Sequence, residues 1–133
     1  MTKSELSQYY YLCREIEQSE RDLRALQKKA AAGSIAPSAV FSKTKKCIDA
    51  DSEYTVLIDE QAELIKEVKF RAEREKHRIL IYIKGIDDSL TRMIFKYRYI
   101  DMLSWRAVAI QVGGNNTEDS VRKIAYRYIK KDG

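Results

Sequence analysis

The chain has 133 residues, enough for one domain or for a small domain with an extension. Hydrophobic residues make up 44% and charged residues 34%, with one proline and five glycines, a balance typical of long solvated helices rather than sheet. The net charge of +5 permits a polyanionic partner. Apolar runs stay well short of the ~20 residues that span a bilayer, and the first residues lack the apolar core of a signal peptide. We therefore expect a cytoplasmic protein with no membrane contact.

Residues 4–32 predict a first amphipathic helix. Apolar side chains recur there at steps of three and four residues, and charged side chains occupy the other face. The apolar positions are Leu6, Tyr9, Leu12, Cys13, Ile16, Leu23, Leu26 and Ala30.

A loop and a second, longer helix are predicted next. Residues 33–51 contain the only proline, Pro37, and predict a turn of the chain. A helix is predicted from about residue 51 to residue 84, where the apolar steps resume at Tyr54, Ile58, Ala62, Ile65, Val68, Ala72, Ile79, Tyr82 and, just beyond, Ile86. The two helices predict an antiparallel, coiled-coil-like hairpin over residues 1–84. Its apolar stripe would serve as the core and as the interface of a homo-oligomer, most simply a dimer.

The end of the second predicted helix is rich in charge of both signs. Cations outnumber the three glutamates in residues 66–84. One interpretation is a surface for a nucleic-acid backbone. The favoured interpretation is a solvated helix face with pairs four residues apart, such as Glu67 with Arg71.

After Gly85 the sequence predicts a separate domain of short helices, residues 85–133. Asp87 or Asp88 can cap a helix that runs to about Asp101. The inner face of that helix carries Leu90, Ile94, Tyr97 and Ile100.

The last two predicted helices meet at the sequence GGNN, residues 113–116. Ser104 caps the helix before it, Gly113 ends that helix in a left-handed conformation, and Asn116 or Thr117 caps the helix after it. The expected core positions are Val108, Ala109 and Val112 before the turn, and Val121, Ile124, Ala125 and Tyr128 after it. Short helices joined by such a corner predict a helix-turn-helix. The alternative is a three-helix packing unit that binds no DNA.

In a helix-turn-helix the second helix enters the major groove, with its N-terminal, outward residues at base edges. Ser104 and Arg106, at the start of the preceding helix, are candidate phosphate contacts. Trp105 is expected to pack in the core. Double-stranded DNA is the predicted partner, and the remaining candidate contacts are Asn116, Thr117, Glu118, Ser120, Arg122, Lys123, Tyr126, Arg127 and Lys130.

The stretch TRMIFKYRYIDMLSWRAVAIQVGGNNTEDSVRKIAYRYIKK resembles region 4 of bacterial sigma factors, which reads a promoter element. The similarity rests on IFKYRYIDMLSW, VA..VG and VRKI…R…K, and YIDMLSW and GGNNTEDSVR carry most of it. With the N-terminal helices added, the chain resembles small sigma-like proteins of phages and prophages of Gram-positive bacteria, of the autolysin-regulator and late-gene activator kind. This resemblance implies that Arg122, Lys123 and Arg127 face DNA.

The chain also departs from the sigma pattern. It lacks the sigma regions that melt DNA and grip polymerase, and its GGNN turn is longer than the usual sigma corner. The resemblance therefore favours a phage regulator that binds DNA and can touch RNA polymerase over a stand-alone sigma factor.

Three classes of function stay open at this point. A sequence-specific regulator of phage genes is the leading hypothesis. The second is a DNA-packaging recognition subunit, since small terminase subunits also combine a helix-turn-helix with helical oligomerisation segments. The third is an interaction module that holds polymerase or a sigma factor without touching DNA.

No enzyme activity, cofactor or metal is expected. His77 is the single histidine, and Cys13 and Cys47 are isolated, so neither forms a metal or redox motif. Acidic residues near the start of the second helix suit a helix N-terminus better than a Mg²⁺ centre. They are Asp49, Asp51, Glu53 and Asp59.

Overall fold

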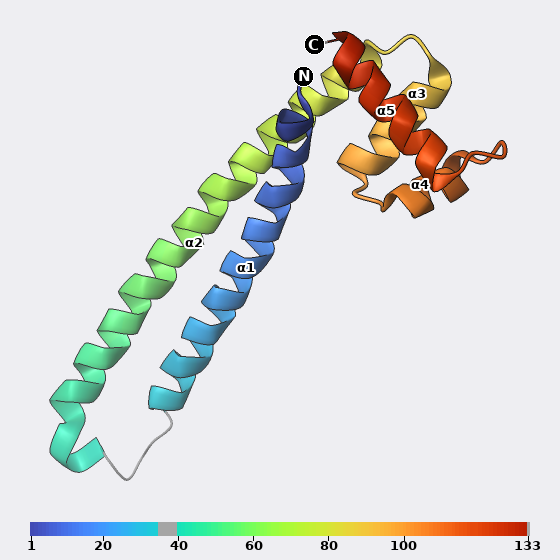
Figure 1. Cartoon of the computed structure of the whole chain (residues 1–133). Helices are drawn as coiled ribbons and strands as arrows, with labels where there is room; N and C mark the ends of the chain where they lie inside the picture. Colours follow the sequence, from blue (N-terminus) through green and yellow to red (C-terminus); the bar gives the residue numbers. More distant parts are fainter. Residues whose placement is uncertain (35–39, 133) are drawn as a thin grey trace. The chain divides into compact units, whose positions relative to one another are not determined.

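The computed structural model describes the backbone of residues 1–34 and 40–132 and the side chains of residues 1–32 and 53–132. Within these residues every regular element is helical, so the protein is all-α, as the sequence predicts (Figure 1). None of the described helices is both long enough and apolar enough to cross a membrane.

Two long helices occupy the first part of the chain. Helix α1 spans Lys3–Ser34, close to its predicted range. Helix α2 spans Val40–Lys84, so the prediction of a loop over residues 33–51 is wrong for residues 40–50, and it is also wrong for Gly33 and Ser34, which end α1. The stretch 40–50 contains Lys43, Lys45 and Lys46, which favour helix, and the helix-breaking Pro37 precedes it. The remainder of the predicted loop, residues 35–39, lies outside the described residues.

The contacts divide the chain into two compact units. Unit 1 contains Met1–Cys13 and Arg71–Gly133, and unit 2 contains Arg14–Phe70. Helix α2 ends at Lys84, but the compact units do not divide at the predicted domain boundary between residues 84 and 85. The unit that holds the C-terminal helices also includes the start of α1 and the end of α2.

In unit 2, α1 and α2 lie side by side (Figure 1). The Gln61 side-chain amide donates a hydrogen bond to the carbonyl oxygen of Ser19 over 3.0 Å. The Lys69 ammonium lies 3.8 Å from a carboxylate oxygen of Glu20. These contacts join the two helices through polar groups as well as through the apolar stripe.

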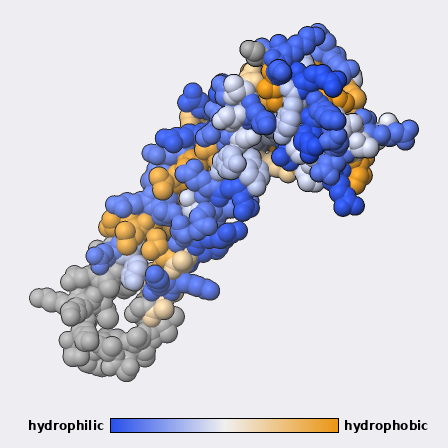
Figure 2. Space-filling view, viewed as in Figure 1, coloured by the Kyte–Doolittle hydropathy of each residue, from blue (hydrophilic) through white to orange (hydrophobic). Residues whose placement is uncertain are grey.

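Part of the apolar surface of α2 stays uncovered in unit 2. Figure 2 shows this surface between hydrophilic side chains. Leu57 and Leu64 keep 42% and 48% of their surface exposed, and Val56 keeps 52%. A pair of helices therefore does not bury all the large apolar side chains of this unit.

Unit 1 contains the short C-terminal elements. They are α3 (Ser89–Phe95), a π-helical turn η2 (Lys96–Ile100), α4 (Trp105–Val112) and α5 (Glu118–Asp132). Helices α3, α4 and α5 all pack on one another (Figure 1). The Asp88 carboxylate caps α3, as predicted, by accepting from the Thr91 N–H over 3.0 Å.

The core of unit 1 draws on both ends of the chain. Phe95 is fully buried, and its ring centroid lies 5.4 Å from that of Tyr99 and 5.5 Å from that of Tyr128. The first turns of α1 help to form this core. Its buried apolar members are Leu6, Tyr9, Leu12, Ala72, Ile79, Ile83, Ile86, Ile94, Phe95, Tyr99, Trp105, Val108, Ala109, Val121 and Ala125.

The π-helical turn changes which residues of this region face the core. The Asp101 N–H donates to the carbonyl oxygen of Lys96, five residues back, over 3.0 Å. A π-helical turn contains more residues than an α-helical turn. The residues that point toward the core within the turn therefore differ from those that an α-helical periodicity predicts. Of the predicted inner positions only Ile94 is fully buried, while Leu90, Tyr97 and Ile100 are half-buried. Within the turn Tyr99 is buried in place of Tyr97 and Ile100, and Thr91 and Phe95, which precede the turn, are buried beside Ile94 in α3.

Candidate nucleic-acid interface

The start of α4 is a capped helix end at the surface. Ser104 has an extended backbone, and its hydroxyl accepts from the Ala107 N–H over 3.2 Å. Arg106, two residues further on, is exposed. The sequence prediction of Ser104 as a cap is therefore confirmed, and an exposed guanidinium lies beside the backbone N–H groups of this helix end.

The GGNN segment forms an ordered corner. Gly113 and Gly114 both have φ of 65°, and so does Asn115. Asn116 holds the corner in shape: its side-chain amide donates to the Gly113 carbonyl oxygen over 2.8 Å, and its backbone N–H reaches the same oxygen over 3.2 Å. Glycine and asparagine are the residues that tolerate this left-handed backbone, so the sequence of the turn matches its geometry.

Reciprocal hydrogen bonds cap the start of α5. The Thr117 hydroxyl accepts from the Ser120 N–H over 3.1 Å, and the Ser120 hydroxyl accepts from the Thr117 N–H over 2.9 Å. Glu118 is exposed in the first turn, where a carboxylate is favoured by the helix dipole. Asn116, Thr117 and Ser120 thus take part in building the corner.

The exposed face of α5 carries four cations. Val121 and Ala125 are fully buried on the opposite face. We call this set the α5 cation face, consisting of the half-buried Arg122 and the exposed Lys123, Arg127 and Lys130.

Asp119 holds two of these cations through ion pairs along the helix. Its carboxylate pairs with the Arg122 guanidinium and lies 2.9 Å from the Lys123 ammonium. The hydrogen bond and charge of Lys123, followed by the charge of Arg122, hold the pKa of Asp119 below its usual value. Pairs of this kind on an exposed face contribute little to stability, so the two cations can exchange Asp119 for another anion.

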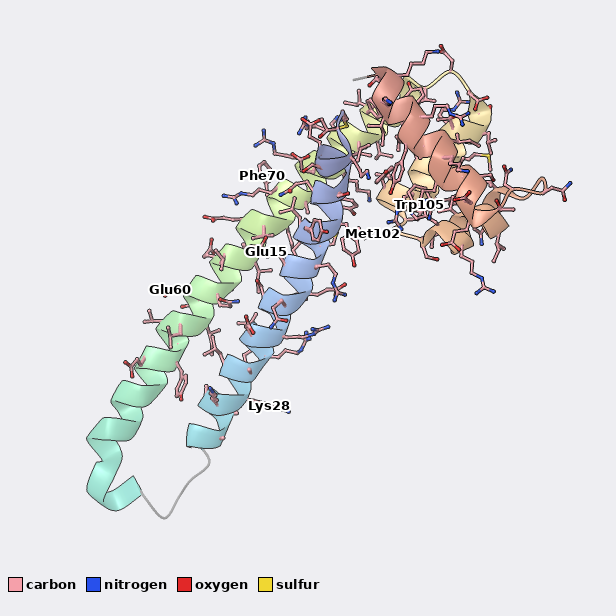
Figure 3. All side chains as sticks on the ribbon, viewed as in Figure 1. Glu15, Lys28, Glu60, Phe70, Met102 and Trp105 are labelled. Atoms are coloured by element: carbon pink, nitrogen blue, oxygen red, sulfur yellow. The ribbon has the colours of Figure 1, made fainter. Side chains whose placement is uncertain are left out.

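Tyr126 lies at the edge of this face and packs against other side chains of unit 1. Its ring meets the Trp105 ring edge-on, with centroids 5.7 Å apart. The Lys3 ammonium lies 3.9 Å from the centroid of the Tyr126 ring, a cation–π contact of about 0.5–1 kcal/mol. Trp105 is buried, as predicted, at the start of α4 (Figure 3). Tyr126 is therefore a half-buried residue that joins α5 to α4 and to the start of α1.

A hollow of about 380 Å³ lies beside the start of α4. The Arg98 side chain lines it, stacks over Trp105 with its guanidinium carbon 4.6 Å from the ring centroid, and donates to the Leu103 carbonyl oxygen over 3.0 Å. Burial raises the pKa of Tyr99, another lining residue, to about 12, so its hydroxyl stays protonated. The complete lining is Leu6, Ser7, Tyr10, Tyr11, Arg98, Tyr99, Met102 and Ser104.

Lys3 and Arg98 are the cations beside this surface that sequence reasoning missed. Lys3 is separated from Tyr126 by most of the chain, and no local spacing connects them. Arg98 lies in the π-helical turn, where an α-helical periodicity assigns the wrong face. The apolar start of the first helix, with Leu6, Tyr9 and Leu12, was the available signal that this segment has a packing partner.

The residues considered for chemistry stay apart. His77 is exposed and Cys13 is half-buried, while the Cys47 side chain lies outside the described residues. Among the described side chains, no group of three His, Cys, Asp or Glu residues is placed to hold a metal ion. Glu53 and Asp59 are exposed, and the side chains of Asp49 and Asp51 are not among those described.

Comparison of the chain with protein-family models, with curated proteins and with solved structures found no match.

Proposed function

We propose that this protein is a sequence-specific DNA-binding regulator of phage or prophage genes, in which α4, the GGNN corner and α5 act as a sigma region 4-like helix-turn-helix. In this proposal α5 enters the major groove. The N-terminus of α4 contacts phosphate through Ser104 and Arg106. Helices α1 and α2 serve as an antiparallel hairpin that joins copies of the chain.

The observation that carries the proposal is the combination of the ordered corner with the α5 cation face. α4 and α5 pack on each other through Val108, Ala109 and Val121, which are almost fully buried. The corner is held by hydrogen bonds of Asn116 and by the Thr117–Ser120 cap. A packed pair of helices with cations on the free face of the second one is the kind of arrangement with which helix-turn-helix proteins read duplex DNA, and it supports the proposal.

The α5 cation face can supply both contacts to bases and contacts to the phosphate backbone, and DNA recognition needs both. Arg122 and Lys123 lie near the start of α5, where bidentate or single hydrogen bonds to guanine are possible. Arg127 and Lys130 lie further along and suit the phosphate backbone. Glu118, exposed at the first turn, can accept a hydrogen bond from a cytosine amino group.

A second function is favoured by one exposed side chain on α4. Ile110 keeps 70% of its surface exposed, and it lies four residues after the exposed Arg106 on the same helix. An apolar side chain flanked by a cation suits a protein contact better than a phosphate contact. RNA polymerase or a sigma factor is the proposed partner for this face, either together with DNA or in its place.

The test of DNA binding uses the double variant Arg122→Ala with Arg127→Ala. We expect it to lose binding to cognate DNA selected from phage and host genomic fragments, with helical content and oligomeric state unchanged. Arg21→Ala with Arg24→Ala, two exposed positions of α1, is the matched control and should bind as the parent chain does. Retardation of the cognate fragment by the first variant at moderate salt would show that α5 is not the recognition helix. Recovery of polymerase without DNA from the same host would favour the second function.

A further inference from the structure

The start of α1 lies in the same compact unit as the proposed recognition helix. Leu6 is fully buried in this unit, and Tyr9 and Leu12 are almost so. This segment is therefore part of the folded unit that carries α5. The side chains of this segment that are not buried lie on the same unit as the residues of α4 and α5 that are proposed to contact DNA.

The free side of this segment carries a cation and polar aromatic side chains. Lys3, Ser7, Tyr10 and Tyr11 follow one another at the spacing that places side chains on one side of a helix. Lys3 is exposed and lies over Tyr126 of α5. Ser7, Tyr10 and Tyr11 line the hollow that Arg98 and Ser104 also line. We call these four residues the α1 edge.

The α1 edge thus lies between the two regions that are proposed above to contact DNA, the α5 cation face and the start of α4. At one end Lys3 meets α5 beside the α5 cation face, and at the other the hollow reaches Ser104 at the start of α4. No carboxylate lines the hollow, and Arg98 is its charged residue. Cations, hydroxyl groups and tyrosines are the groups that proteins use toward the phosphates and sugars of a duplex.

We propose that the α1 edge is an additional DNA-backbone contact, in which Lys3 binds a phosphate next to the one reached by α5 and the rim of the hollow faces the same strand. This inference rests on the proposed DNA-binding function and adds the first turns of α1 to its interface. Lys3 has no base edge to read in this arrangement, so its contribution is independent of DNA sequence.

The expected effect follows from counterion release. Each neutralised phosphate makes the slope of log affinity against log salt more negative by about 0.9, so one contact is worth about fivefold in affinity near 0.15 M salt. Lys3→Met keeps an apolar stem on the Tyr126 ring and removes the charge. We expect this variant to reduce the magnitude of this negative slope by about 0.9 and to weaken binding to cognate and to scrambled duplexes by the same factor.

Two further pairs of variants separate charge from folding. Lys3→Arg should restore both the slope and the affinity, and Lys28→Met, at an exposed position of unit 2, should change neither. Ser7→Asp adds a carboxylate at the rim of the hollow, whereas Ser7→Asn adds the same shape without charge. We expect the aspartate variant to bind DNA several-fold more weakly than the asparagine variant, with equal thermal unfolding midpoints.

Fluorescence anisotropy over about 0.05–0.3 M salt, the range in which counterion release dominates, measures these effects. If the parent chain binds DNA and Lys3→Met keeps its full salt slope, the α1 edge is not a DNA contact and the proposed function still stands. If the parent chain shows no salt-dependent binding to any duplex, the proposed function and this inference are both overturned. A lower affinity of Lys3→Met at an unchanged slope would assign Lys3 to packing on Tyr126 and would also overturn the inference.

Discussion

Asp119 is an acidic residue in a face that is otherwise proposed to bind an anion. Its carboxylate holds Arg122 and Lys123 in the free protein. DNA must replace Asp119 as the partner of these cations, and the cost is small because the pairs are exposed. At the same time the carboxylate repels phosphate. This repulsion disfavours binding of duplexes whose bases form no hydrogen bonds with Arg122 and Lys123.

The pKa of Asp119 reports on these pairs. Because its pKa is lowered in the folded protein, the stabilisation from the pairs is present above the unfolded value of 3.8 and is lost as the pH falls through the folded pKa. Lys123 is the largest cause of the shift. We expect Lys123→Met to move the pKa of Asp119 up toward 3.8, and Arg122→Met to move it less, in a carboxyl NMR titration.

Asp88 is the internal control for that titration. Its pKa is also lowered, mainly by the hydrogen bonds that it accepts from Thr91 at the start of α3. The Lys123 variant should leave the Asp88 titration unchanged. A common shift of both carboxyl groups, or none at Asp119, would contradict the assigned ion pairs.

At this scale sequence reasoning worked where a residue acts through its own helix. The caps Asp88 and Ser104 and the buried Trp105 were predicted from local spacing, and the structure confirms them. It did not find the position of Lys3 over Tyr126, because that contact joins opposite ends of the chain. Periodicity carries no information about which distant element covers a helix face.

The helical elements themselves were largely predictable from apolar spacing and from glycine. The corner between α4 and α5 was expected at GGNN and is found there. The π-helical turn η2 was not expected, since its sequence KYRYI also satisfies an ordinary helix. The turn accompanies the packing of Phe95 against Tyr99 in the core, a contact that local sequence does not specify.

The corner has one position that only glycine suits. Gly113 has φ of 65° and ψ of −150°, a backbone conformation that other residues adopt only with strain. A Cβ atom at Gly113 would meet nothing within 4 Å, so the cost of Gly113→Ala is one of backbone conformation alone. We expect this variant to lower the free energy of unfolding by about 1–3 kcal/mol in urea denaturation.

Gly114→Asn is the matched comparison for Gly113→Ala. Gly114 also has φ of 65°, and its added Cβ would stay 3.6 Å from the Asn116 side chain, an ordinary contact. Asparagine tolerates left-handed backbone better than alanine does. This variant should therefore lose less stability. Equal losses at the two positions would show that the corner does not depend on the conformation of Gly113.

For the whole molecule, the exposed apolar side chains of α2 bear on how many copies act together. Leu57 and Leu64 are seven residues apart on α2, which places them on one face, and both are about half exposed. The shallow hollow beside Leu64 is rimmed by carboxylates, and its lining is Asp59, Glu60, Glu63, Leu64 and Glu67. An apolar stripe with charged flanks is the pattern by which helices associate in water.

Self-association would bury the surface that one hairpin leaves exposed. Covering the exposed halves of Leu57 and Leu64 in two copies would contribute a few kcal/mol, on the order of 1 kcal/mol for each side chain. Two joined copies would also hold two recognition helices, so that weak contacts to two half-sites reinforce each other. Oligomeric state and DNA affinity should therefore change together.

Leu57→Glu combined with Leu64→Glu tests this link. We expect sedimentation equilibrium to show a dimer for the parent chain and a monomer for the variant, with helical content retained in circular dichroism. The monomer should bind a two-site duplex at least tenfold more weakly, since linked sites gain ~10²–10⁴ in avidity. Ala25→Glu with Gln27→Glu adds the same two charges at exposed positions of α1 and should leave both properties intact. If the parent chain is a monomer, self-association is removed from the proposal. If the leucine variant is still a dimer by sedimentation equilibrium, the interface lies elsewhere on the chain.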